Sequence, residues 1–311
     1  MPTVRKPPAL KPGAKIRVVL PASPARADVI ERGLAELRRL GYSPNAPRIA
    51  TKEDAYFAGE TKRRTQEFLA ALADPVAGAI ISVRGGYGST YLVDALAARK
   101  KLPPRILIGF SDLTALCVYL WKAHRWVTFQ GPMVAAGFDC GPGAHGGYDE
   151  DSFRRAVTQT KGGWTLDLQG DAIATGEARG VLLGGCLTLI QCTLGTPWEL
   201  DTRGAILVLE DRGMRPYQVD RALTHLRQAG KLRGVRGVIL GEFPECPAPP
   251  DSPSVREVCA RILGELKVPV IWGAPIGHTS RPMLTLPLGV RAKLAAKGSG
   301  QLEILEPAVT P

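Results

Sequence analysis

The chain has 311 residues, 45% of them hydrophobic and 22% charged, so it can bury the core of one large domain or two ordinary ones, and a largely disordered chain is excluded. Its net charge of +11 is compatible with a nucleic-acid partner, but the basic residues are spread out and have no interleaved aromatic residues. We therefore expect no nucleic-acid partner and a solvated basic surface, on which Lys62, Arg63 and Arg64 form one dense cluster.

The cysteines and the N-terminus bear on metal binding and compartment. None of the six cysteines lies in a C-x-x-C motif or at a zinc-like spacing from histidine, so no metal is expected. Cys117, Cys186 and Cys192 fall in apolar helical patterns and are predicted to be buried free thiols. Residues 1–8 lack the apolar core of a signal peptide, and no stretch is long enough to span a membrane. The expectation is a cytoplasmic protein with no membrane partner.

Strand and helix patterns alternate through the first half of the chain. The apolar run at residues 15–20 predicts a strand, and apolar residues on one face between Val29 and Leu40 predict the helix that follows. The later segments are predicted helices at 61–72, 91–96 and after Thr114, and predicted strands at 79–83, 105–108 and 127–129. This alternation is typical of βαβ units. We predict an N-terminal α/β domain over residues 1–137, with a parallel flavodoxin-like or Rossmann-like sheet.

The second half has a different organisation. A glycine-rich passage at 137–148 introduces a predicted linker region, residues 138–173. Residues 174–311 are predicted to form a C-terminal α+β domain that contains a small sheet or barrel. Its predicted helices are 185–194, 217–228 and 255–266, and its predicted strands are 205–209, 235–240, 268–272, 284–290 and 301–305.

Ser111 lies at a corner between a predicted strand and a predicted helix. Gly109 relaxes the backbone before it, and Asp112 and Thr114 are typical of a helix start. A hydroxyl at such a corner lies beside free N–H groups of the helix, where an attacking serine and its oxyanion donors are easily combined. The structural alternative is that Ser111 only caps the helix.

Two polar residues at strand ends of the second half can complete such a site. Glu210 ends one predicted strand, and His278 follows another. Histidine accepts a serine proton well near neutral pH, and a carboxylate fixes its tautomer, so Ser111, Glu210 and His278 are a candidate catalytic triad. The alternatives are that Glu210 pairs with an arginine such as Arg212 and that His278 is a satisfied loop histidine. The other histidines, predicted to be surface residues, are His124, His145 and His225.

The glycine-rich segment at residues 84–88 follows a strand and precedes a helix, as a phosphate loop would. It matches neither G-x-G-x-x-G nor the Walker pattern, so no nucleotide cofactor is expected. The glycines instead predict a backbone that comes close to a substrate, with the N–H groups of Gly86 and Asp112 as oxyanion donors. Arg84 is a candidate for binding a substrate carboxylate, with a structural role in the loop as the alternative.

The order of these residues resembles that of the LD-carboxypeptidase family, a family of serine peptidases with the microcin-immunity peptidases as a sister branch. The resemblance runs through nearly the whole chain. It rests on the segments PASP at 21–24, RGGYG at 84–88, GFSDLT at 109–114, LED at 209–211, PYQVDR at 216–221 and GH at 277–278.

The resemblance implies that Ser111 is the nucleophile, Glu210 the carboxylate and His278 the base, with the N–H groups of Gly86 and Asp112 as the oxyanion hole. It implies that the site lies between the N-terminal and C-terminal domains, that the protein is a homodimer, and that the site contains no metal or organic cofactor. The implied reaction releases the C-terminal D-alanine from an L,D bond of murein tetrapeptides during peptidoglycan recycling in the cytoplasm. The third residue of the peptide, diaminopimelate or lysine, stays open.

Two segments depart from the family pattern and bear on the substrate. Cys186 stands where the family often has asparagine, and the loop from Arg212 to Arg215 is basic and apolar where an acidic residue is common. Two rival functions stay open. A peptidase of the sister branch, acting on peptidyl or aminoacyl nucleotides, would favour an aromatic recognition loop, for which Trp198 is the nearby candidate. A non-catalytic peptide-binding protein would bind a peptide without hydrolysing it.

Overall fold

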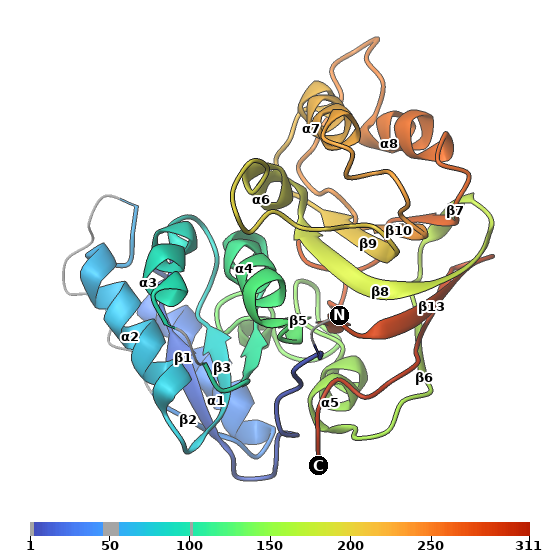
Figure 1. Cartoon of the computed structure of the whole chain (residues 1–311). Helices are drawn as coiled ribbons and strands as arrows, with labels where there is room; N and C mark the ends of the chain where they lie inside the picture. The colour runs from blue at the N-terminus through green and yellow to red at the C-terminus, as the bar shows by residue number, and fades with distance from the viewer. Residues whose placement is uncertain (1–2, 46–55, 100–101) are drawn as a thin grey trace.

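Two β-sheets organise the chain, one formed mainly by its first half and one by its second (Figure 1). The structure is a computed structural model, and it describes residues 3–45, 56–99 and 102–311. Met1 and Pro2, which belong to the N-terminal segment considered above, lie outside the described residues. The sequence predicts a mixed α/β fold with a parallel sheet followed by a second sheet, and both are present.

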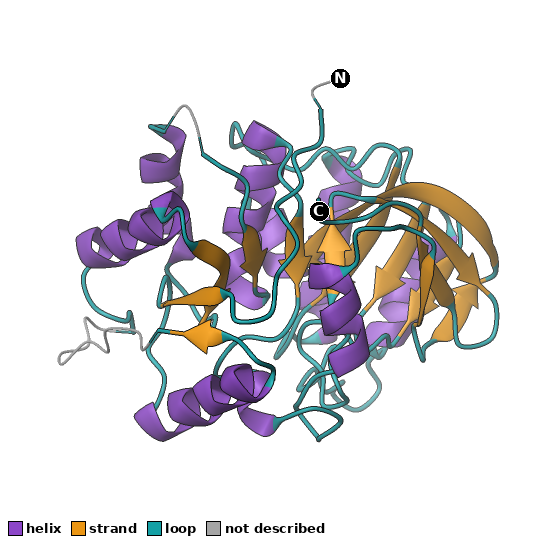
Figure 2. Ribbon diagram, turned by 90° about the horizontal axis from the view of Figure 1, so that it is seen from below, coloured by secondary structure: helices purple, strands orange, loops and turns teal. Residues whose placement is uncertain are grey.

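The first sheet has six strands, in the spatial order β12 (Leu286–Leu288), β5 (Thr128–Gln130), β4 (Ile106–Ile108), β3 (Ala77–Ser82), β1 (Lys15–Val19) and β2 (Ser43–Pro44). All neighbours are parallel except β12 and β5. Helices cover both faces (Figure 2), α1 (Ala27–Arg39) on one and α2 (Thr61–Ala73), α3 (Val93–Ala97) and α4 (Thr114–His124) on the other. The central strand β4 is therefore apolar at every position and fully buried.

The second sheet has eight strands, in the spatial order β6 (Trp164–Asp167), β14 (Gln301–Ile304), β13 (Arg291–Ala296), β8 (Gly176–Cys186), β9 (Ala205–Glu210), β10 (Gly237–Leu240), β11 (Val270–Trp272) and β7 (Asp171–Ala174). The strands β8 to β11 are parallel, and the others pair antiparallel. One face packs against α6 (Leu187–Cys192), α7 (Pro216–Gln228) and α8 (Val255–Gly264). The loops that follow the parallel strands meet at one edge, where sites form in such sheets.

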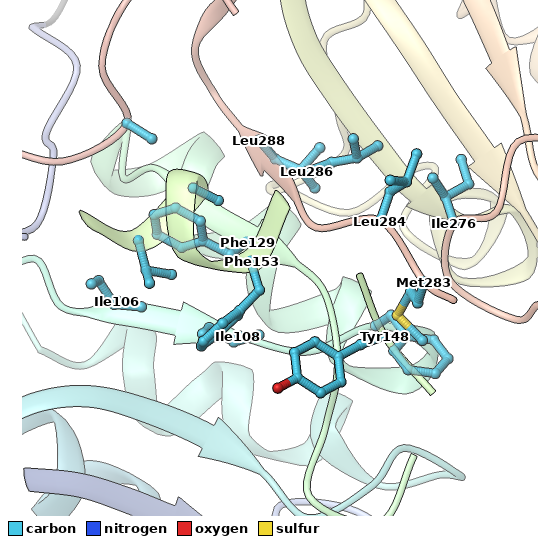
Figure 3. Close-up of a cluster of buried hydrophobic side chains, with 14 of the residues drawn as sticks. Ile106, Ile108, Phe129, Tyr148, Phe153, Ile276, Met283, Leu284, Leu286 and Leu288 are labelled. Carbon is cyan, nitrogen blue, oxygen red and sulfur yellow. The ribbon is translucent and has the colours of Figure 1, made fainter. Parts of the chain in front are cut away.

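The two halves of the chain share a core because β12 joins the first sheet. It pairs antiparallel with β5, with Leu286 opposite Gln130. Ile276 and Leu284, which precede it, lie in the same cluster of buried apolar side chains as Phe129 (Figure 3). The strand predicted at 284–290 is therefore present, but it belongs to the first sheet and not to the second. The apolar residues of this strand predict that it is buried, but they do not indicate which strand it pairs with.

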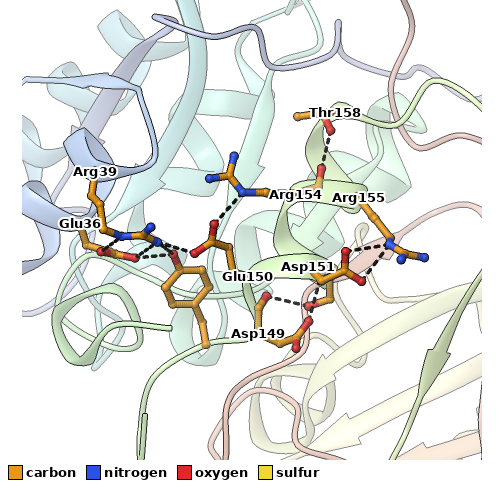
Figure 4. Close-up of polar contacts among 10 residues, drawn as sticks. Glu36, Arg39, Asp149, Glu150, Asp151, Arg154, Arg155 and Thr158 are labelled. Atoms are coloured by element: carbon orange, nitrogen blue, oxygen red, sulfur yellow. Dashed lines mark hydrogen bonds and ion pairs between the residues drawn. The ribbon is translucent and has the colours of Figure 1, made fainter. Parts of the chain in front are cut away.

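A polar network fixes the segment after β5 to helix α1 (Figure 4). Glu36 on α1 accepts hydrogen bonds from Tyr148 Oη at 2.5 Å and from Arg39 Nε at 2.7 Å. Arg39 also pairs with Glu150, the first residue of α5 (Glu150–Thr158). Burial alone would raise the pKa of Glu36, but the bonds from Arg39 and Tyr148 lower it overall. The predicted linker region, residues 138–173, therefore contains secondary structure: the turn η3 (Phe138–Cys140), helix α5 and strand β6.

The helix predicted at 185–194 is shorter than expected. Gly184 and Gly185 continue β8 with φ of +143° and +142°, a conformation that glycine adopts readily, so α6 starts only at Leu187. Cys192, the last residue of this short helix, is exposed, and its predicted burial is wrong.

Candidate active site

Ser111 occupies the corner between β4 and α4, as the sequence predicts. It opens a short 3-10 turn, η2 (Ser111–Leu113), and its φ of +60° lies in the left-handed region that non-glycine residues rarely adopt. Such a backbone is typical of a serine that a strand-to-helix turn holds out of a sheet. Neither η2 nor α4 has a side-chain capping bond at its N-terminus, so the interpretation of Ser111 as a helix cap has no support.

Glu210 and His278 form a pair at the end of β9. Glu210 is fully buried, and its Oε2 accepts hydrogen bonds from His278 Nδ1 at 2.7 Å and from the His278 backbone N–H at 2.9 Å. Gly277 permits this approach, because a Cβ there would lie 2.3 Å from Glu210 Cδ. With Nδ1–H donating to the carboxylate, Nε2 is left as an acceptor. The pair has the arrangement of a base and its orienting carboxylate.

The charges around His278 set its protonation. Burial lowers the pKa of His278, but the charge of Glu210 and its hydrogen bond outweigh burial, and the pKa lies above the ordinary value of 6.5. The charge of Asp211 raises this pKa further, while that of Arg212 lowers it. Two charged residues of the loop after β9 therefore shift the pKa of the imidazole in opposite directions.

One cavity brings Ser111 and His278 together. It has a volume of about 360 Å³ and is also lined by Arg84 and Arg212; we call it the Ser111 lobe. Phe110, the residue before Ser111, meets the His278 ring edge-on, with 5.1 Å between the ring centroids. Both residues are described, and no hydrogen bond joins Ser111 Oγ to the imidazole. In active sites without substrate such bonds are often long, and they tighten in the Michaelis complex.

A second cavity, of about 290 Å³, adjoins the Ser111 lobe across His278. The lining residues that the two cavities share are Phe110, Ala136, Arg212 and His278. We call the second cavity the Thr279 lobe, because Thr279 lines this cavity and does not line the Ser111 lobe. His145, predicted to be a surface residue, is exposed and lines this lobe. The cleft thus continues on both sides of the imidazole.

The glycine loop after β3 faces Ser111. A Cβ on Gly85 would lie 2.8 Å from Ser111 Cβ, so no side chain fits there without displacing the serine. Gly86 has a φ of +103° and lies against Ser23, whose N–H donates to Gly85 O at 3.2 Å. Within the described part of the chain, the N–H groups of Gly86 and Asp112 donate to no acceptor. Two free donors therefore flank the serine.

The side chain of Asp112 ties the serine turn to the glycine loop. Its buried Oδ2 accepts a hydrogen bond from the Ser89 N–H at 2.7 Å, and Ser89 Oγ donates to Asp112 O at 2.6 Å. Ser89 opens the turn η1 (Ser89–Leu92) directly after the glycines. Burial raises the pKa of Asp112. The sequence predicted a helix start at Asp112 and an oxyanion role for its N–H, but not these bonds to Ser89, because nothing in it pairs residues 23 positions apart.

Arg64 connects the loops around the cleft through hydrogen bonds of its guanidinium. The sequence predicted it to be part of a solvated basic cluster, and this is wrong, because Arg64 is 1% exposed. Its guanidinium donates to the backbone carbonyls of Pro21, Gly59 and Gly88, the first and last of which flank Ser23 and the glycine loop. A guanidinium carries enough donors to bind several carbonyls at once, and composition alone does not distinguish such an arginine from a surface one.

Three arginines line the Ser111 lobe, namely Arg26, Arg84 and Arg212. Arg26 and Arg212 form ion pairs with neighbouring carboxylates. Arg84 donates to Pro24 O at 3.2 Å and has no acidic partner among the described residues. Of the three, Arg84 is thus the one arginine whose guanidinium has no carboxylate from the described part of the protein beside it.

Two residues that stood out in the sequence lie away from the cleft. The Cys186 N–H donates to Thr114 Oγ1 at 3.1 Å, and its thiol lies 3.5 Å from Asp211 Oδ2. Trp198 is half-buried and meets the Tyr119 ring edge-on, with 6.0 Å between centroids. Neither Cys186 nor Trp198 lines either lobe.

The arrangement of the described residues bears on metal binding and on membrane insertion. Across residues 3–45, 56–99 and 102–311, no group of three or more His, Cys, Asp and Glu side chains is placed to hold a metal ion. Over the same ranges, no helix combines the length and the hydropathy that crossing a membrane requires.

Two family profiles match the chain. The LD-carboxypeptidase N-terminal domain matches residues 16–131, and the LD-carboxypeptidase C-terminal domain matches residues 179–294. Ser111 falls in the first match, and Glu210 and His278 fall in the second.

Proteins similar to this chain carry related names. A protein of Bacillus subtilis (strain 168) named "Probable murein peptide carboxypeptidase" is 32% identical over 295 residues, which cover 93% of this chain and 91% of that protein. The "Murein tetrapeptide carboxypeptidase" of Pseudomonas aeruginosa is 29% identical over 271 residues, which cover 85% of this chain and 88% of that protein. A solved structure of MccF in complex with glutamyl sulfamoyl guanosine is similar with a TM-score of 0.85 and 25% identity, over 98% of this chain and 99% of that one.

Proposed function

The chain belongs to the LD-carboxypeptidase family, and from this we propose that it releases the C-terminal D-alanine of murein tetrapeptides with Ser111 as nucleophile, His278 as base and Glu210 as its orienting carboxylate. The observation that carries the assignment is the Glu210–His278 pair, which opens into the cavity that Ser111 lines. Carboxypeptidase activity on an L,D bond is the activity of the family; the residue roles and the tetrapeptide substrate are the proposal.

The geometry supports acyl transfer through a serine ester. His278 Nε2 takes the Ser111 hydroxyl proton as Oγ attacks the carbonyl carbon of the third peptide residue. The N–H groups of Gly86 and Asp112 bind the oxyanion, and each such donor stabilises the transition state by roughly 3 kcal/mol in comparable sites. The C–N bond then breaks, and His278 gives its proton to the D-alanine amine. His278 then takes a proton from water as the water oxygen attacks the ester carbonyl carbon. The bond between this carbon and Ser111 Oγ breaks, and His278 gives the proton to Oγ.

The substrate of a carboxypeptidase ends in a free carboxylate, which needs a cation near the scissile bond. Arg84 lines the Ser111 lobe and has no acidic partner among the described residues. We assign Arg84 to the D-alanine carboxylate. Arginine suits this role because its guanidinium can form two parallel hydrogen bonds with a carboxylate.

The sister-branch function gains no comparable support. An aromatic recognition loop would favour a nucleotide substrate, yet Trp198 packs on Tyr119 and lines neither lobe. The names of the sequence relatives point instead to murein peptides.

A homodimer and a cytoplasmic location complete the proposal. The dimer rests on the family resemblance, and light scattering of the purified protein tests it. The location is supported by the cysteines, because all six are free thiols, as is usual in a reducing compartment.

The test is mass spectrometry of a murein tetrapeptide, and of its L,L analogue, incubated with the purified protein. We expect D-alanine from the L,D peptide alone and none with Ser111→Ala. The control is Ser252→Ala, which changes an exposed serine outside both lobes and should leave turnover intact. Release of D-alanine at the wild-type rate by Ser111→Ala would overturn the mechanism.

A further inference from the structure

An ion pair lies at the mouth of the cleft beside His278. Arg212 comes two residues after Glu210, and Glu245 lies in the loop after β10. Arg212 Nε donates to Glu245 Oε2 at 2.8 Å, and its Nη2 donates to Oε1. The side chains are 54% and 61% exposed, so both retain surface for a ligand.

The loops that carry this pair are braced against each other. The Gly213 N–H donates to Pro244 O at 3.0 Å, and the Met214 N–H donates to Cys246 Sγ at 3.2 Å. Glu245 itself has a φ of +57°, a strained conformation that the surrounding contacts hold. The two charges are therefore presented in a fixed geometry, and less side-chain freedom is lost when a ligand binds.

These two residues are the fixed charges of the Thr279 lobe. Among its lining residues Glu245 is the one carboxylate and Arg212 the one arginine or lysine. The neighbouring Glu242 does not line the lobe, and its carboxylate pairs with Arg281 and accepts a hydrogen bond from the Ser280 N–H. A ligand in the Thr279 lobe thus meets one cation and one anion side by side.

This arrangement matches the free end of one of the two diamino acids that the sequence left open. The side chain of diaminopimelate ends in an ammonium and a carboxylate on the same carbon, whereas that of lysine ends in an ammonium alone. A carboxylate suits the guanidinium of Arg212, and an ammonium suits Glu245. Both lobes meet at His278, so a peptide cleaved at Ser111 can extend this side chain into the Thr279 lobe.

We propose that the Arg212–Glu245 pair selects murein peptides whose third residue is diaminopimelate, by binding the zwitterionic end of its side chain. The proposal rests on the proposed function. It places D-alanine in the Ser111 lobe with Arg84 and the side chain of the third residue in the Thr279 lobe.

The test compares three tetrapeptides that differ only at the third residue: diaminopimelate, diaminopimelate with an amidated distal carboxyl, and lysine. For the wild type we expect kcat/KM to be about tenfold higher for diaminopimelate than for the other two, the size of one charge-assisted hydrogen bond. Arg212 also lowers the pKa of His278, so the variants are compared at a pH on the plateau of the kcat/KM profile, where His278 is neutral in each. There Arg212→Gln should remove this preference by raising KM for diaminopimelate alone. Glu245→Gln should raise KM for all three peptides, because each retains the ammonium.

Arg227→Gln is the matched control, because Arg227 pairs with Glu265 at a similar exposure and lines neither lobe. It should leave the preference intact. Equal kcat/KM for the three peptides in the wild type, or an equal loss on all three in Arg212→Gln, would overturn the inference, since a merely structural brace acts on every peptide alike. If the wild type hydrolyses none of them, the proposed function fails, and calorimetric binding of the peptides to Ser111→Ala then decides the inference alone.

Discussion

Glu210 holds His278 at two points with one oxygen: Oε2 accepts hydrogen bonds from both the ring Nδ1 and the backbone N–H of the same residue. The orientation of the imidazole is therefore fixed relative to its own backbone. The other oxygen, Oε1, is buried and has no hydrogen-bond partner in the described chain. A buried oxygen without a hydrogen bond raises the free energy of the folded state. The position of the carboxylate therefore serves to orient His278 and does not maximise the stability of the fold.

Glu210 should set the acid limit of activity. His278 must be neutral to accept the serine proton, and Glu210 raises its pKa above 6.5, so kcat/KM should begin to fall at a higher pH than with an ordinary histidine. In Glu210→Gln the pKa of His278 falls, because the charge that raised it is gone while burial remains. The acid limb should shift to lower pH, and kcat should fall by about 10⁴-fold. A limb that keeps its position in the kcat/KM profile would contradict this assignment.

Gly85→Ala should impair catalysis without unfolding the protein. The added Cβ would lie 2.8 Å from Ser111 Cβ, so the serine or the loop must shift. A displacement of about 1 Å at a reacting group lowers turnover by about 100-fold. Gly264→Ala is the control, because a Cβ there meets nothing within 4 Å. Stopped-flow or steady-state kinetics with thermal melting separates the two effects; an unchanged kcat in Gly85→Ala would mean that the loop adapts.

Arg64→Met should lower stability and activity together. The variant keeps the apolar stem but leaves the carbonyls of Pro21, Gly59 and Gly88 without their donor. Each unsatisfied buried group raises the free energy of the folded state by about 1–3 kcal/mol, so urea unfolding should show a clear loss. Lys62→Met, on the exposed face of the same helix, should show none. Equal stability of the two variants would contradict the bracing role.

Thr114→Val should loosen the contact between the serine helix and the second sheet. Thr114 is 3% exposed and accepts a hydrogen bond from the Cys186 N–H, and valine of the same shape removes the acceptor. We expect the free energy of unfolding to fall by about 1–3 kcal/mol, with a lower kcat because Glu210 and Ser111 are positioned across this contact. Thr90→Val changes an exposed threonine and serves as the control. A stability equal to that of the wild type would show that water replaces the hydroxyl.

The sequence predicts the parts of the site that follow from strand ends. Glu210 and His278 follow apolar runs that form strands of one sheet, and the carboxyl edge of a parallel sheet is where such residues gather, so their proximity could be anticipated. Ser111 follows a strand of the other sheet, and its place beside this pair was implied only by the family resemblance. The burial of Arg64 could not be anticipated, because the sequence of a charged cluster does not distinguish a buried arginine from a solvated one. The Arg212–Glu245 pair joins loops 33 residues apart and depends on how the loops brace each other, for which the sequence holds no local signal.

The pairing of β12 with β5 has a consequence for synthesis of the chain on the ribosome. About 150 residues separate the two strands, so at about 5–20 residues per second the edge of β5 stays without its neighbour for roughly 8–30 s. During that interval the nascent first half exposes an open strand edge and the apolar surface around Phe129, both of which favour aggregation. Completion of the first sheet therefore waits until β12 has been translated, and the emerging chain is a natural client for a chaperone that binds early.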